Sequence, residues 1–112
     1  MEINEIKVNE VVVLKLKGSI DFQNTSKLKE AFESVDGRGI KKLVLDLKEA
    51  EYIDGFILSV FVNFQRYCSK KRIKIILSGM NREIKGIFTK TKLYNLFDIY
   101  KTREEAINSF ES

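Results

Sequence analysis

The fold of this chain is decided by the stretch Leu43-Val44-Leu45-Asp46-Leu47-Lys48-Glu49-Ala50-Glu51-Tyr52-Ile53-Asp54-Gly55-Phe56-Ile57-Leu58. Its first five residues form a short apolar run, interrupted only by Asp46, which predicts a central strand covered on both faces. A loop follows. Asp54 is then a favourable N-cap, because its carboxylate accepts hydrogen bonds from the free backbone N–H groups of a helix start. The stretch therefore predicts a buried strand, a loop and a helix that begins at Asp54.

The helix that begins at Asp54 is expected to be mostly buried. Apolar residues recur at helical spacing from Gly55 to about Lys70, and they leave one narrow polar stripe, made of Ser59, Asn63, Arg66 and Lys70. Cys68 lies on the apolar side, far from the helix N-terminus that would lower the pKa of its thiol. We therefore expect Cys68 to be a core residue and not a nucleophile.

The residues before this stretch predict a hairpin and a helix. Two strands, Ile3 to Val8 and Val11 to Lys17, are separated by two turn residues. A loop comes next, and Asn24 or Thr25 can cap a helix that extends to about Val35. The N-terminal part thus supplies an antiparallel edge to the sheet.

The residues after this stretch continue the alternation of strands and helices. A strand at Arg72 to Leu77 precedes a helix near Asn81, a short apolar segment ends at Tyr100, and residues 102–105 have the capping-box spacing that opens a last helix. Strands joined through helices run parallel with right-handed crossovers. The sequence predicts a single α/β domain, residues 1–112, with a small mixed and mostly parallel sheet and flanking helices.

The composition excludes several kinds of chemistry. The chain has 112 residues, no histidine and one cysteine, so Ser-His-Asp and Cys-His catalysis, an internal disulfide and a multi-cysteine zinc site are all excluded. It contains no glycine motif of the kinds that cradle phosphates. No signal-peptide pattern and no stretch of ~20 apolar residues is present. We expect a cytoplasmic protein without membrane contact and without a cofactor.

Two carboxylates are expected at the carboxyl ends of the strands, where ligands gather in open α/β sheets. Asp21 follows the second strand and Asp54 follows the third. Such a pair can bind Mg²⁺ or perform acid–base chemistry, but helix capping and loop hydrogen bonds explain both residues better. An enzyme is therefore the least favoured class of function.

Four motifs resemble the STAS domain family, and within it the anti-sigma factor antagonists of bacteria. Gly18-Ser19-Ile20-Asp21 is similar to the G-x-[IL]-D loop of that family, and residues 43–47 are similar to its central strand. Tyr52-Ile53-Asp54 resembles the approach to the phosphorylation loop of the family, and residues 102–106 resemble the start of its terminal helix. The resemblance covers nearly the whole chain. It implies a non-enzymatic domain that binds an anti-sigma factor or a related switch kinase.

The chain departs from the family pattern at the phosphorylation loop. In the family this loop typically continues as Asp-Ser-[Ser/Thr]-Gly-Leu, and the partner kinase phosphorylates the second hydroxyl residue. Here Asp54 and Leu58 match, but Gly55 and Phe56 stand at the hydroxyl positions and Ile57 replaces the glycine. Because Phe56 cannot accept a phosphate, the usual switch is expected to be lost.

The nearest hydroxyl to the lost acceptor belongs to Ser59, one turn deeper in the helix. Its position in the polar stripe is that of an ordinary surface serine. We therefore predict no phosphorylation site in this chain.

We expect the loop and helix start to form a partner surface built from Asp21, Asp54, Gly55, Phe56 and Ile57. An exposed Phe56 beside Ile57 would be an apolar anchor of the kind that dominates interface energies. The alternative is that Phe56 folds back onto the core. The expected partner is an anti-sigma factor or a related protein, and the chain acts either alone or as a homodimer.

A nucleic-acid or acidic-ligand binder is the alternative function. The net charge is +4, and the region from Arg66 to Lys92 contains one acidic residue, Glu83, and nine basic ones: Arg66, Lys70, Lys71, Arg72, Lys74, Arg82, Lys85, Lys90 and Lys92. Such charges form a binding site only if they cluster in space. Stacking aromatic residues are not interleaved among most of them, so nucleic-acid binding is the less favoured function.

Overall fold

Strands and helices alternate along residues 1–111, the part of the chain that the computed structural model describes. The strands are β1 (Glu2–Val8), β2 (Val11–Ile20), β3 (Lys42–Asp46), β4 (Ala50–Ile53), β5 (Lys74–Ser78) and β6 (Asp98–Tyr100). The α-helices are α1 (Thr25–Gly37), α2 (Gly55–Lys71), α3 (Arg82–Lys90) and α4 (Arg103–Ser109). Two single 3₁₀ turns, η1 (Phe22–Asn24) and η2 (Leu93–Asn95), complete the described elements. None of these helices is long and apolar enough to span a membrane.

The sheet is mixed, as predicted, with the strand order β1-β2-β3-β5-β6. The β1–β2 hairpin is antiparallel and the other pairs are parallel. The strand β2 is long enough to have two parallel neighbours on its inner side. Residues 11–15 pair with β3, and residues 18–20 pair with β4 after a shift of register between Gly18 and Ser19.

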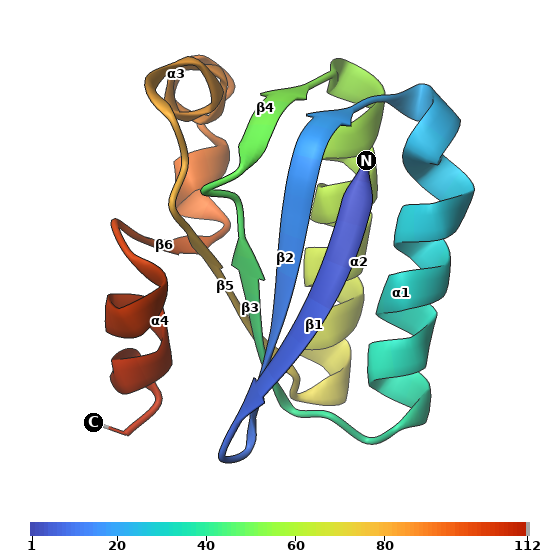
Figure 1. The fold of residues 1–112 in the computed structure, drawn as a ribbon, viewed down its shortest axis with the longest axis vertical. Coiled ribbons are helices and arrows are strands. Elements are labelled where there is room, and N and C mark those ends of the chain that lie inside the picture. The colour runs from blue at the N-terminus through green and yellow to red at the C-terminus, as the bar shows by residue number, and fades with distance from the viewer. Residues whose placement is uncertain (112) are drawn as a thin grey trace.

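Different helices cover the two faces of the sheet (Figure 1). The alternation of side chains along β3 shows this division. Leu43 and Leu45 belong to the larger core, together with residues of α1, α2 and α3, while Val44 belongs to a smaller cluster with Ala106 of α4. All three β3 side chains are fully buried. The prediction of a central strand covered on both faces is confirmed.

Two predicted helix starts are confirmed by their caps. Asn81 Oδ1 accepts a hydrogen bond from the Ile84 N–H at 2.8 Å, and Thr102 Oγ1 accepts one from the Glu105 N–H at 3.1 Å. These bonds satisfy backbone donors that have no partner within the first turn of a helix.

The start of α1 differs from the prediction that Asn24 or Thr25 caps it. No side chain caps this helix. Asn24 Oδ1 instead accepts a hydrogen bond from the Asp21 N–H at 3.0 Å, and Thr25 Oγ1 donates to the Phe22 C=O at 2.7 Å. The 3₁₀ turn η1 precedes α1 directly, so both side chains stabilise this turn.

The strand β4 was predicted to be a loop. Its four residues have inward-facing ends, Ala50 and Ile53, and two exposed residues between them, so they lack the regular alternation of a strand. The strand forms because β2 extends beyond β3 and leaves backbone groups that need a partner. β4 provides this partner.

We expect Gly79→Ala to destabilise the fold. Gly79 follows β5 with a φ of +74°, and a Cβ atom there would lie 2.9 Å from both Asp46 Oδ1 and the Lys48 backbone N. The strained backbone alone costs about 1–3 kcal/mol in the free energy of unfolding. Urea denaturation followed by circular dichroism measures this loss.

The matched control for this substitution is Gly86→Ala. Gly86 lies within α3, and a Cβ atom there meets open space. Alanine at an exposed helical position is favoured over glycine by about 0.5–1 kcal/mol, so the control should be stabilised. Equal effects of the two substitutions would contradict the steric account of Gly79.

Candidate functional site

The site is organised around Asp54, the N-cap of α2. Its Oδ1 accepts a hydrogen bond from the Ile57 N–H at 2.9 Å, and its Oδ2 accepts one from the Phe22 N–H at 3.0 Å. The backbone N–H of Asp54 donates to the Ile20 C=O at 3.2 Å. One residue therefore fixes the start of α2 against the turn that follows β2.

Asp21 stabilises the same turn from within. Its Oδ1 accepts a hydrogen bond from the Gln23 N–H at 3.0 Å, while its own N–H donates to Asn24 Oδ1. The carboxylates of Asp21 and Asp54 are thus both bound to backbone donors, in agreement with the expectation that they cap and order the loop. Among residues 1–111, no group of three or more His, Cys, Asp or Glu side chains is placed to hold a metal ion.

Three exposed aromatic side chains lie on the segments that meet at Asp54. Phe22 follows β2, Tyr52 lies in β4 and Phe56 lies in the first turn of α2, and their exposed fractions are 62%, 44% and 59%. Of the two alternatives for Phe56, the structure shows the exposed one. We call these three residues, together with Asp21, Asp54 and Gly55, the Asp54 surface.

Ile57 differs from its expected position beside Phe56 at the surface. Its side chain is fully buried and belongs to the larger core. Successive helical residues point about 100° apart, so an outward Phe56 turns Ile57 toward the sheet. Ile57 therefore cannot contact a partner directly, and its part is to pack the first turn of α2 against the core.

The sequence did not identify Phe22 and Tyr52 as surface residues. Tyr52 was expected in a loop, and the structure places it in β4, whose two middle residues are both exposed. Phe22 is an apolar residue directly after the G-x-[IL]-D-like motif, at a position where the chain turns. An apolar residue at a turn was the one feature of the sequence that could have indicated an exposed Phe22.

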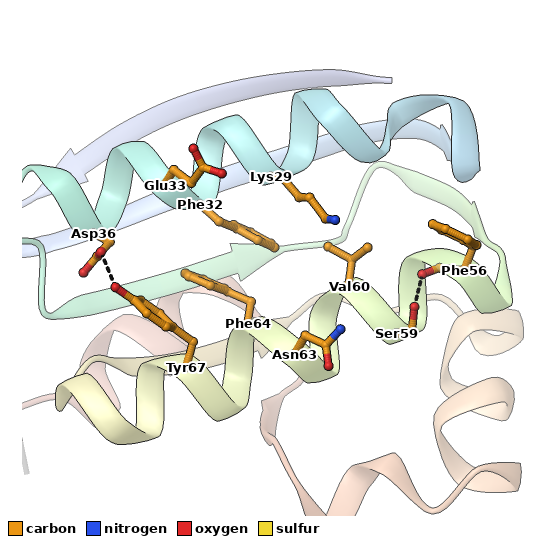
Figure 2. A pocket seen from close by; sticks show the side chains of 10 residues that line it. All are labelled: Lys29, Phe32, Glu33, Asp36, Phe56, Ser59, Val60, Asn63, Phe64 and Tyr67. Atoms are coloured by element: carbon orange, nitrogen blue, oxygen red, sulfur yellow. Dashed lines mark hydrogen bonds between the residues drawn. The ribbon is translucent and has the colours of Figure 1, made fainter.

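A groove of about 490 Å³ runs between α1 and α2 from the Asp54 surface (Figure 2). Phe56 lies at one end. The rings of Phe32 and Phe64 line its middle and stack with their centroids 4.0 Å apart. At the other end the Tyr67 hydroxyl donates a hydrogen bond to the Asp36 carboxylate, which raises the pKa of Tyr67. Aromatic rings and polar side chains therefore line the groove together.

The two remaining candidate side chains on α2 have contrasting environments. Ser59 is exposed, and its hydroxyl donates a hydrogen bond to the Phe56 C=O at 2.6 Å. Cys68 is fully buried, and desolvation raises the pKa of its thiol to about 12. The thiol is therefore protonated at neutral pH, and the prediction that Cys68 is a core residue is confirmed.

The structure divides the basic region from Arg66 to Lys92 between two ends of the sheet. Its first part lies on the last turns of α2 and at the start of β5, while its second part lies on α3, beyond the other end of β5. Lys74 is paired with Asp98 at 3.0 Å. The five residues of β5 separate the two groups by roughly 15 Å, so the region does not form one continuous patch.

Comparison with known proteins gives a consistent assignment. The sequence profile of the family described as the STAS domain matches residues 2–106. An anti-sigma-B factor antagonist of Listeria monocytogenes is 27% identical over 105 residues, which are 94% of this chain and 91% of the relative.

Two solved structures extend the comparison. The crystal structure of a candidate anti-sigma factor antagonist from Thermotoga maritima has a TM-score of 0.92 and 26% identity, and the match covers 98% of this chain and 95% of that one. The Bacillus cell fate determinant SpoIIAA in its phosphorylated form has a TM-score of 0.75, 17% identity and coverage of 97% and 99%. At this identity, the SpoIIAA comparison shows a common fold.

We expect Asp54→Ala to lower the free energy of unfolding by about 2 kcal/mol, because it removes the acceptor of two backbone N–H groups. Hydrogen exchange of the Phe22 and Ile57 amides should also accelerate. Thr102→Ala is the control, since Thr102 caps α4 through one backbone bond and should cost about 1 kcal/mol. Unchanged protection of the Phe22 amide would contradict the bridging role of Asp54.

Proposed function

The chain belongs to the STAS domain family, and we propose that it is a non-enzymatic regulatory domain of the anti-sigma factor antagonist type, acting in the cytoplasm. Its partner in this proposal is an anti-sigma factor or a related switch kinase. The relatives named as anti-sigma factor antagonists support this class of function. The partner binds the Asp54 surface.

The exposure of Phe56 is the observation that carries this proposal. Phe56 has an exposed fraction of 59% although it is a large apolar residue. Large aromatic residues supply much of the binding free energy when a partner covers them. The backbone beneath Phe56 is held by the hydrogen bonds of Asp54, so little conformational entropy is lost when the partner docks.

The partner complex is proposed to lack the phosphorylation switch of the family. A phosphate adds about two negative charges at an interface and so can release a partner. Gly55 and Phe56 carry no hydroxyl, and the hydroxyl of Ser59 is bound to a backbone carbonyl one turn into the helix. Binding is therefore constitutive with respect to phosphorylation at this loop.

The partner surface is tested with Phe56→Asp. A charged side chain at the centre of an apolar contact should weaken binding to the purified anti-sigma factors and switch kinases of the source organism about tenfold or more, as measured by calorimetry. Tyr94→Asp is the control, because Tyr94 is also exposed, at 50%, but lies in η2. Equal affinities of both variants would remove Phe56 from the interface. Binding of none of these proteins by the native chain would refute the proposed partner class.

The missing switch is tested with Phe56→Ser, which restores a hydroxyl at the family's acceptor position. We expect mass spectrometry to find one phosphate on Phe56→Ser after incubation with ATP and the kinase that binds the chain. The native chain and the control Phe56→Ala should gain none at residues 54–59. Stoichiometric phosphate on Ser59 of the native chain would show that the switch has moved rather than disappeared.

A further inference from the structure

The outer edge of β1 is a free strand edge. β1 contains seven residues, and among the described strands it pairs only with β2. The strand at the opposite edge of the sheet, β6, has three residues. A long edge presents a row of unpaired backbone groups to another chain unless bulges, prolines or inward-pointing charges protect it. The register of β1 has no bulge, and the chain has no proline. β1 does carry charges on the face that includes Ile3, at Glu5 and Lys7, but both side chains are exposed and their charges are opposite, so a second strand can pair them.

The register of the hairpin determines which backbone groups of β1 are free. Val8 and Val11 close a two-residue turn, so they form a hydrogen-bonded pair. Hydrogen-bonded and non-hydrogen-bonded pairs alternate along an antiparallel ladder. The N–H and C=O groups of residues 2, 4, 6 and 8 therefore face β2, and those of residues 3, 5 and 7 point outward.

The side chains of β1 are arranged symmetrically about Ile6. Glu5 and Lys7 flank it on one face of the strand, the face on which Ile3 packs against the larger core. Ile6 lies on the other face with 37% of its side chain exposed. Arg38, the residue directly after α1, pairs with Glu5 at 2.6 Å and holds the pKa of Glu5 below its ordinary value, so Glu5 is charged at neutral pH.

We propose that β1 is a dimerisation edge that pairs with β1 of a second copy of this chain. The two strands run antiparallel about a two-fold axis through Ile6. Glu5 of each copy then lies opposite Lys7 of the other. The two residues form a backbone hydrogen-bonded pair, and their side chains carry opposite charges. Ile6 faces Ile6 of the second copy in a non-hydrogen-bonded pair. The contact is isologous, as in most homodimers, and joins the two sheets into one.

Charge complementarity selects this register. An axis through Glu5 would place the two Glu5 carboxylates opposite each other, and like charges in directly opposed positions are destabilising. An axis through Asn4 would place Glu5 opposite the apolar Ile3. Of the axes through residues 4 to 7, only the axis through Ile6 places opposite charges across from each other, in two Glu5–Lys7 pairs.

Disulfide formation tests the register directly. Residues in a non-hydrogen-bonded pair have Cα atoms about 4.5 Å apart, which is within the range of about 4.4–6.8 Å for disulfides. Mild oxidation of Ile6→Cys should therefore produce a covalent dimer on a non-reducing gel. The native Cys68 is buried and should not contribute.

Asn4→Cys is the matched control for the cross-linking experiment. It lies on the same face of the same strand, and its two thiols would be about 13 Å apart. Equal cross-linking of the two variants, or cross-linking of Asn4→Cys alone, would overturn the register.

Exchange of charges tests the interface by a second route. The native chain should show a concentration-dependent monomer–dimer equilibrium by analytical ultracentrifugation. Glu5→Lys and Lys7→Glu should each weaken the dimer about tenfold, because each replaces two attractive pairs with two repulsive ones. The double variant should restore the native affinity.

The controls separate dimerisation from folding. Glu83→Lys makes the same change of charge on α3, away from β1, and should leave the dimer unchanged. Circular dichroism establishes that each variant is folded. A native chain that remains monomeric at millimolar concentration, or a double variant as weak as either single variant, would overturn the proposal. The partner surface does not take part in these tests, so they stand independently of the proposed function.

Discussion

The backbone of β2 is the constraint on which the rest of the structure depends. Its residues pair with β1 along one side, and with β3 and then β4 along the other. β2 extends beyond the end of β3, so the backbone groups of its last residues cannot pair with β3. They pair instead with β4, which follows β3 after a short turn. This arrangement brings Asp54, the residue after β4, against the end of β2. The hydrogen bond from the Asp54 N–H to the Ile20 C=O completes it.

Much of the fold could be predicted from the sequence because its signals are local. The apolar run of β3, the helical spacing of α2 and the side-chain caps of α2, α3 and α4 all lie within a few residues of the elements they specify. β4 could not be predicted in this way, since its pairing partner is more than thirty residues distant. The side chain of Asn24 could cap α1 or stabilise the turn before it, and in the structure it closes the 3₁₀ turn η1 by accepting the hydrogen bond of the Asp21 N–H.

The candidate site was predicted less completely than the fold. For Phe56 and Ile57 the phase of the helix is informative, because Phe56 lies three residues before Ser59 and so continues the polar stripe of α2, whereas Ile57 falls on the apolar side. The structure agrees with this phase, since Phe56 is exposed and Ile57 is buried. The exposed residues Phe22 and Tyr52 come from two other segments. Only the tertiary structure brings those segments to Asp54.

The Asp54 surface and the β1 edge are separated along β2, and this separation has a functional consequence. Residues 4–8 of β1 pair with the first half of β2, residues 11–15, whereas the Asp54 surface begins after its last residue, Ile20. A dimer formed through β1 therefore leaves both copies of the Asp54 surface open. Two such surfaces on one particle raise the effective concentration for a partner that is itself dimeric. If binding is not released by phosphorylation, as proposed above, the concentration of the chain would then control how much partner is captured.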